Sequence, residues 1–182
     1  MIISLLGTNG AGKSHLVRRI MSFYPVSRKL EYPGRQKPAG YILTHNNDSE
    51  KHLYVPGHYE IANGGLDTLP SLSTAYELMR IHALEMGCNV LYEGKNFTDK
   101  PQNLLDLRDA GLPIAVALID EPLEDCVKAV RERGHKIQEK TIEALHRKSR
   151  RHYYDFQEEK VECFLGSREQ VFAKVFRWLN LV

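Results

Sequence analysis

The chain has 182 residues, of which 42% are hydrophobic and 26% are charged, and its formal net charge at pH 7 is +2. This length fits one globular domain, residues 1–182, with a core large enough for a sheet covered by helices. No run of 18 apolar residues is present, which excludes a membrane-spanning helix, so we expect a cytoplasmic protein with no membrane partner. The three cysteines are scattered without metal-site spacing and are expected to be reduced thiols.

The N-terminal part of the chain carries a phosphate-binding motif. An apolar run from Ile2 to Leu6 predicts a buried strand, a helical pattern runs from Lys13 to Phe23, and the sequence GTNGAGKS joins them. This is the Walker A pattern G-x-x-x-x-G-K-[ST] in its expected strand–loop–helix context. Its glycines let backbone amides wrap phosphate oxygens without a Cβ clash, and the helix aims its positive end at the anion. The motif predicts a nucleoside triphosphate site in a P-loop NTPase fold.

The roles within this loop follow from charge and reach. Lys13 can contact the β- and γ-phosphates, and the Ser14 hydroxyl can ligate Mg²⁺. ATP and Mg²⁺ are therefore the expected cofactors. The residues expected to bind the nucleotide are Gly7, Thr8, Asn9, Gly10, Ala11, Gly12, Lys13, Ser14 and His15.

The segment from about 24 to 69 has weak periodicity and several prolines, which predicts an irregular substrate-binding insertion. Short strands at Gly40 to Thr44 and His52 to Val55 could form a hairpin. Its cations could meet nucleic-acid phosphates and its aromatic rings could stack on a base, although most of the tyrosines could instead pack on the sheet. These side chains are Arg28, Lys29, Arg35, Lys37, Tyr32, Tyr41, Tyr54, His58 and Tyr59, and we expect substrate contacts from Arg35, Lys37, Tyr41, Tyr59 and Glu60.

The rest of the chain alternates helical patterns with short apolar runs, which predicts an α/β fold with a mostly parallel sheet and helices on both faces. Gly87 and Gly134 are expected at helix C-termini, and Ser167 with Gln170 fits a capping box. The predicted helices are Leu72 to Met86, Leu123 to Arg133, Glu139 to Gln157 and Arg168 to Leu181, and the predicted strands are Asn89 to Glu93, Ile114 to Asp120 and Val161 to Leu165.

Two carboxylates are candidates for catalysis. Glu93 ends a strand before Gly94, and ligands bind beyond the carboxyl ends of parallel strands, so Glu93 is expected near Mg²⁺ or the acceptor. Its competitor Asp120 could equally cap a helix. Asp67 follows a glycine turn and could take the proton of an attacking hydroxyl, or cap the helix that begins near Pro70. Glu60 is the alternative base.

A basic segment follows the strand that ends at Asp120. Between Lys128 and Arg151 there are nine lysines and arginines against three acids, and we expect a lid at about 131–151. Arg131 and Arg133 could reach the transferring phosphoryl group when the lid closes, or simply complement the dipole of their helix.

Several of these motifs together resemble a specific family. They are Gly34 to Tyr41, Gly57 to Glu60 leading into Gly64 to Thr68, and Leu91 to Gly94. Together with the Walker A loop, they are similar to phage-encoded P-loop kinases that phosphorylate the hydroxymethyl group of 5-hydroxymethyluracil in DNA. The resemblance implies that Lys13 and Ser14 bind ATP and Mg²⁺, that Asp67 and Glu93 surround the acceptor hydroxyl, and that Arg35 and Lys37 seat the DNA. It also implies a place in the host cytoplasm.

Two other functions remain open from the sequence. A kinase of free deoxynucleotides or another small hydroxyl metabolite would share every phosphate-handling residue. A nucleotide-dependent switch or ATPase would transfer phosphate only to water, but such a protein needs no acceptor pocket. The net charge of +2 is weak for a nucleic-acid binder, so only the local basic segment favours DNA.

Overall fold

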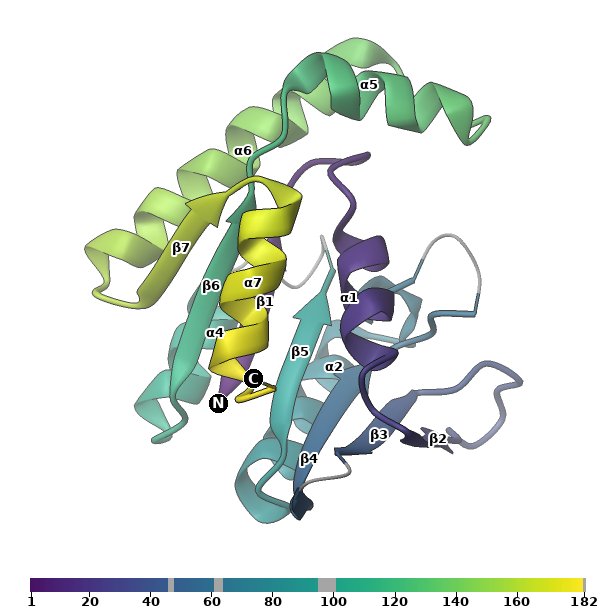
Figure 1. Cartoon of the computed structure of the whole chain (residues 1–182), viewed down its shortest axis with the longest axis vertical. Helices are drawn as coiled ribbons and strands as arrows, with labels where there is room; N and C mark the ends of the chain where they lie inside the picture. Colours follow the sequence, from purple (N-terminus) through teal and green to yellow (C-terminus); the bar gives the residue numbers. More distant parts are fainter. Residues whose placement is uncertain (46–47, 61–63, 95–100, 182) are drawn as a thin grey trace.

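The protein is an α/β sandwich around a seven-stranded sheet (Figure 1). The computed structural model describes residues 1–45, 48–60, 64–94 and 101–181. The strand order is β2-β3-β4-β5-β1-β6-β7, in which the pairs from β4 to β7 are parallel and the pairs β2–β3 and β3–β4 are antiparallel. The predicted fold class is therefore confirmed.

The elements are as follows. The strands are β1 (Ile2–Leu6), β2 (Val26–Leu30), β3 (Gly40–His45), β4 (Asp48–Pro56), β5 (Asn89–Glu93), β6 (Ile114–Ile119) and β7 (Glu162–Gly166). The helices are α1 (Lys13–Met21), α2 (Leu72–Arg80), α4 (Pro101–Asp109), α5 (Leu123–Glu132), α6 (Glu139–Glu158) and α7 (Arg168–Trp178). A short 3₁₀ turn, η1 (Leu66–Thr68), precedes α2, and a π-helical turn, η2 (Ile81–Glu85), extends it.

Both faces of the sheet are covered because its strands alternate between two cores. In β1, Ile2 and Leu6 pack with residues of α2, α4 and α6. Ile3 and Leu5 pack on the opposite face with residues of α1, α5 and α7. A strand that is apolar on both sides belongs in the middle of a parallel sheet, and β1 lies there between β5 and β6.

The segment 24–69 is more regular than its sequence indicates. The predicted hairpin is confirmed as β3 and β4, and β2, which was not predicted, continues the sheet beyond them. The side chains of β2 are largely exposed, as suits an edge strand, so its sequence lacks the alternation that would mark it. Tyr41 and Tyr54 are buried in the cores, which supports the packing alternative for these rings.

Most of the segment predicted to form a lid, residues 131–151, is helical. From Glu139 onward the chain belongs to α6, a 20-residue helix that packs against β6 and β7. The part of that segment outside these helices is the connection between α5 and α6. The helix α4 was also missed by the sequence patterns, whereas the capping box of Ser167 and Gln170 is confirmed. Among the described residues, no helix has both the length and the apolar character to cross a membrane.

Candidate active site

The Walker A loop joins β1 to α1 beneath α5 (Figure 1), and two of its glycines have positive φ angles. Gly10 has φ +88°, and a Cβ atom there would lie 2.2 Å from the carbonyl oxygen of Cys126 in α5. Gly12 has φ +94°, and its Cβ would lie 2.3 Å from Nε of Arg168. L-residues rarely adopt these angles, so the loop is held in a shape that depends on glycine.

The ammonium of Lys13 lies inside this loop. It donates hydrogen bonds to the carbonyl oxygens of Gly7 (2.8 Å) and Thr8 (3.0 Å), and the Thr8 hydroxyl in turn donates to the carbonyl of Ile142 in α6 (2.9 Å). Burial lowers the pKa of Lys13, while the charges of Glu93 and Asp67 oppose that shift. The sequence-predicted cation and both predicted carboxylates are thus brought together.

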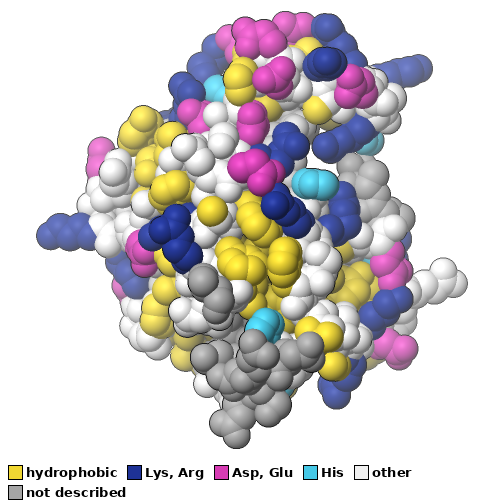
Figure 2. All heavy atoms as spheres, in the orientation of Figure 1, with side chains coloured by type: hydrophobic (Ala, Val, Ile, Leu, Met, Phe, Trp, Pro, Cys, Tyr) yellow, Lys and Arg dark blue, Asp and Glu magenta, His cyan; other side chains and the backbone are white. Residues whose placement is uncertain are grey.

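These residues line one cleft with a volume of about 420 Å³. It is formed by the Walker A loop and α1, by the ends of η1 and β5, and by the connection between α5 and α6. Figure 2 shows Lys and Arg side chains, with a histidine, gathered where α1 begins below α5. The lining residues are Asn9, Gly10, Gly12, Lys13, Ser14, His15, Arg18, Gly64, Asp67, Thr68, Glu93, Gly94, Val130, Arg133, His135 and Ile137.

Glu93 is the buried acid of this cleft, with 4% of its surface exposed. Burial raises its pKa, and this effect outweighs the lowering by Lys13, by a hydrogen bond with the Ser14 side chain and by Arg18. The nearby charge of Asp67 raises the pKa of Glu93 further. Within the described part of the chain, its Oε1 atom has no hydrogen-bond partner. A buried carboxylate oxygen of this kind can ligate a metal ion or accept a hydrogen bond.

Asp67 lies in η1, and hydrogen bonds of the next residue join this turn to the chain that follows β4. The Thr68 hydroxyl donates to the carbonyl of Gly65 (2.7 Å) and accepts from the backbone N–H of His58 (2.9 Å). The N-cap of α2 is Ser71, whose hydroxyl accepts from the N–H of Thr74 (3.0 Å). The alternative that Asp67 or Thr68 caps this helix is therefore wrong, which leaves the Asp67 carboxylate in the cleft.

The short connection after α5 also enters the cleft. Arg133 and His135 line it on either side of Gly134, whose φ of +72° turns the chain at the helix end as predicted. Arg131 is not among the lining residues; its side chain is exposed and pairs with Glu139 (2.8 Å). Of the two predicted lid arginines, the structure brings only Arg133 to the cleft.

Comparison with known proteins decides the family. A 5-hmdU DNA kinase of Pseudomonas phage PaMx11 is 39% identical over 132 residues, which cover 72% of this chain and 68% of the phage protein. The chain belongs to the 5-hmdU DNA kinase family. It is therefore a phosphotransferase that uses a nucleotide, and the resemblance seen in its sequence motifs is confirmed. No family model matches the chain.

Solved structures give a weaker likeness. A deoxyadenosine kinase from M. mycoides, with dCMP and dCDP bound, aligns over 100% of both chains with 15% identity and a TM-score of 0.49. The same enzyme with dATP bound aligns over 99% of this chain and all of the other, with 13% identity and a TM-score of 0.46.

The residues of this kinase fit a magnesium ion. Ser14 and Glu93 are hydrogen-bonded side by side in the cleft, with the orphaned Oε1 of Glu93 and the carboxylate of Asp67 close by. Oxygen donors of this kind are the ligands that Mg²⁺ prefers.

Asp120, the competing acid, accepts two hydrogen bonds from Arg150 (2.8 and 2.7 Å), and the N-cap of α5 is Pro122. Asp120 therefore anchors α6 and is neither a helix cap nor a lining residue of the cleft.

The predicted substrate contacts lie outside the lining of the cleft. Lys37 is exposed, and Tyr41 and Tyr59 are buried, with the Tyr41 hydroxyl accepting from the N–H of Tyr59 (3.2 Å). Glu60 is exposed and forms an ion pair with Lys29.

Arg35 makes a contact within the fold. Its Nη2 donates to the carbonyl oxygen of Thr68 (2.7 Å), so it braces the segment that carries Asp67. The fold thus uses Arg35 to position a cleft residue from outside.

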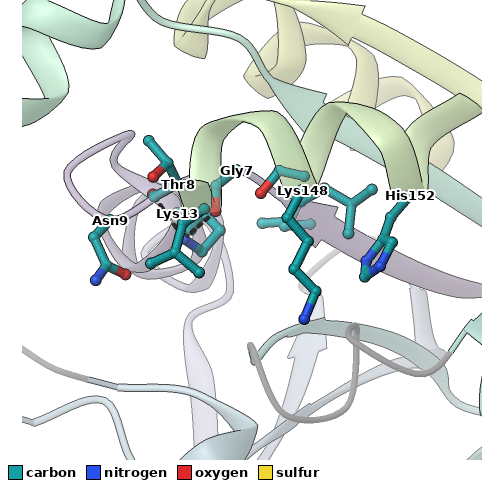
Figure 3. Close-up of a pocket in the computed structure, with 10 residues that line it drawn as sticks. Gly7, Thr8, Asn9, Lys13, Lys148 and His152 are labelled. Carbon is teal, nitrogen blue, oxygen red and sulfur yellow. Dashed lines mark hydrogen bonds between the residues drawn. The ribbon is translucent and has the colours of Figure 1, made fainter. Parts of the chain in front are cut away.

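A smaller cavity of about 30 Å³ also borders Lys13, between the Walker A loop and α6. Figure 3 shows Lys148 and His152 extending from α6 beside the loop. This cavity has room for only about two water molecules. The basic helix α6 thus contributes side chains next to the phosphate site as well as an exposed surface.

Sequence reasoning missed two nitrogen-bearing side chains of the cleft, Arg18 and His135. Arg18 follows Ser14 by four residues, so helical periodicity places both on one side of α1 and could have found it. His135 had no such signal, because its direction depends on the turn at Gly134.

Proposed function

We propose that this kinase transfers the γ-phosphoryl group of ATP to the hydroxymethyl group of 5-hydroxymethyluracil in DNA. The observation that carries the proposal is the single cleft in which the Walker A lysine, two carboxylates and a lid arginine meet, in a chain 39% identical to a phage 5-hmdU DNA kinase. A hydroxyl acceptor needs a base and a pocket, whereas a switch or ATPase transfers phosphate only to water and needs no acceptor pocket.

The proposed roles follow from position. Asp67 accepts the proton of the hydroxymethyl oxygen as that oxygen bonds to the γ-phosphorus and ADP leaves. The product is a phosphomonoester on the pyrimidine. Lys13 and Arg133 neutralise charge on the transferring group, and the amides from Gly7 to Ser14 hold the other phosphates. Mg²⁺ held by Ser14 and Glu93 would neutralise negative charge on the phosphates.

DNA as the acceptor adds a requirement. A base inside a duplex cannot reach the cleft, so the nucleotide must be flipped out or presented as a single strand. The basic residues of 128–151 and the cations Arg28 and Lys37 would then contact backbone phosphates. We place the reaction in the host cytoplasm, where a phage-encoded enzyme meets both DNA and ATP.

The deciding experiment offers one enzyme preparation several acceptors in parallel. Labelled ATP is supplied with DNA containing 5-hydroxymethyluracil, with unmodified DNA, with a panel of mononucleotides, or with water alone. We expect label only in the hydroxymethylated DNA. Label in a mononucleotide, together with none in hydroxymethylated DNA at low salt, would establish the small-molecule kinase instead. Release of inorganic phosphate without any acceptor would indicate an ATPase.

A further inference from the structure

Arg18 extends the cleft beyond the nucleotide loop. It lies on α1 four residues after Ser14, which places it about 6 Å farther along the helix axis. It lines the same cleft as Gly64 and Asp67, which belong to the segment after β4. The wall that begins with the phosphate loop therefore continues toward the segment that carries the proposed base.

The surroundings of Arg18 distinguish it from an ordinary surface arginine. Its positive charge lowers the pKa of both the Glu93 carboxyl and the Tyr59 hydroxyl, against the opposite effect of their burial. Glu93 ends β5 and Tyr59 follows β4, so Arg18 lies where these two strands meet α1. This is the acceptor side of the cleft, and the lid residues Arg133 and His135 come from a different element.

The adjacent arginine has a structural role. Arg19 donates to both carboxylate oxygens of Glu169 (2.8 and 2.7 Å), and its guanidinium lies 3.7 Å from the centre of the Phe172 ring. It therefore joins α1 to α7 on the other side of the helix. Two consecutive residues of one type thus face different surroundings, and only Arg18 belongs to the cleft.

We propose that Arg18 binds a phosphodiester of the acceptor strand next to the nucleotide that is phosphorylated. This inference rests on the proposed function. The phosphates of ATP are accounted for by the loop amides and Lys13 at the start of α1. A guanidinium presents a planar set of donors that matches two phosphate oxygens. A strand carries a phosphodiester on either side of each internal nucleotide, whereas a free mononucleotide carries only a terminal phosphomonoester.

Steady-state kinetics with a 5-hydroxymethyluracil oligonucleotide test the contact. Arg18→Gln is expected to raise the KM for the oligonucleotide by roughly 10-fold or more and to leave the KM for ATP unchanged. It should also make the slope of log kcat/KM against log salt shallower by about one. Arg18→Lys should restore part of the salt dependence. Arg19→Gln is the matched control and should resemble wild type in all three measurements.

A second measurement changes the oligonucleotide, so its wild-type result does not depend on any variant folding. Neutral methylphosphonate linkages are placed one at a time on the 5′ or the 3′ side of the modified nucleotide. We expect wild type to lose oligonucleotide affinity at one of these positions and Arg18→Gln to lose nothing further there. The proposed contact is refuted if neither neutral linkage affects wild type. It is also refuted if Arg18→Gln lowers kcat or ATP affinity without changing the oligonucleotide KM. Failure of the proposed function would look different, because wild type would then transfer nothing to any hydroxymethylated DNA.

Discussion

The backbone of Gly65 lies against the carbonyl oxygen of Glu93, so close that a Cβ atom at Gly65 would be 2.7 Å from that oxygen. The two residues come from segments that each supply one carboxylate of the cleft. Their contact sets how Asp67 stands relative to Glu93, and it exists only because position 65 has no side chain. The distance between Asp67 and Glu93 therefore depends on a contact between backbone segments.

Gly65→Ala should consequently damage both stability and turnover. The position has φ +99°, and the added methyl group would collide with backbone, so we expect a loss of about 1–3 kcal/mol in unfolding free energy. Gly34→Ala is the control, because φ there is +76° but nothing lies within 4 Å of the added Cβ. Chemical denaturation and kcat are measured for both. Equal effects in the two variants would show that contact with Glu93 is unimportant.

Lys13→Ala is expected to abolish transfer while the protein stays folded. The ammonium acts on the phosphates, and burial disfavours its charged form, so its removal should not cost the fold its stability. Turnover should fall by about 10²- to 10³-fold or more, with an unchanged circular dichroism spectrum. Near-normal transfer by this variant would contradict the kinase mechanism.

Asp67→Asn should lower kcat by about 10²- to 10⁴-fold while ATP still binds, as for loss of a general base. Glu60→Gln provides the comparison, because Glu60 is exposed, pairs with Lys29 and does not line the cleft. We expect its kcat to stay near wild type. Titration with ATP and single-turnover transfer separate the two steps. Loss of ATP binding in Asp67→Asn would assign that residue to the metal instead.

The lid arginines should differ from each other. Arg133→Ala is expected to lower kcat with little change in the KM for ATP, because a lid cation acts mainly in the closed transition state. Arg131→Ala should be close to wild type, since its exposed ion pair with Glu139 is outside the cleft. The measurement is the steady-state rate of each variant at saturating ATP, compared with wild type. A large defect in Arg131→Ala would mean that the lid rearranges on closing.

Glu93→Gln should stabilise the protein while it removes activity. Burial raises the pKa of Glu93 above its ordinary value of 4.5, so the native state binds this proton more tightly than the unfolded chain. The group therefore favours folding fully only below pH 4.5, and that contribution is lost as the pH rises through the native pKa. A neutral glutamine does not titrate, so the variant does not lose stability in this way as the pH rises. The Tm difference between Glu93→Gln and wild type should be larger at pH 8 than at pH 5, and an opposite trend would refute the argument.

The phosphate site could be predicted from the sequence because it is local. Eight consecutive residues between a strand and a helix specify the loop, and backbone amides supply most of its contacts. Glu93 could be placed for a similar reason, since the end of a parallel strand next to β1 must lie at the same edge of the sheet. The two-core pattern of β1 and the helix-end signals at Gly134 and Ser167 were equally local.

Tertiary structure decided the rest. Whether Asp67 caps a helix or enters the cleft depended on Ser71, and whether Arg131 or Arg133 faces the phosphates depended on the turn between α5 and α6. Arg35, a predicted substrate contact, donates to the carbonyl of Thr68 in η1, whereas Arg18, which was not predicted, lines the cleft. Sequence determines which side chains are present and how they repeat along an element. The direction in which a long, flexible cation is held is determined by partners that are distant in the chain, so only the folded structure could assign it.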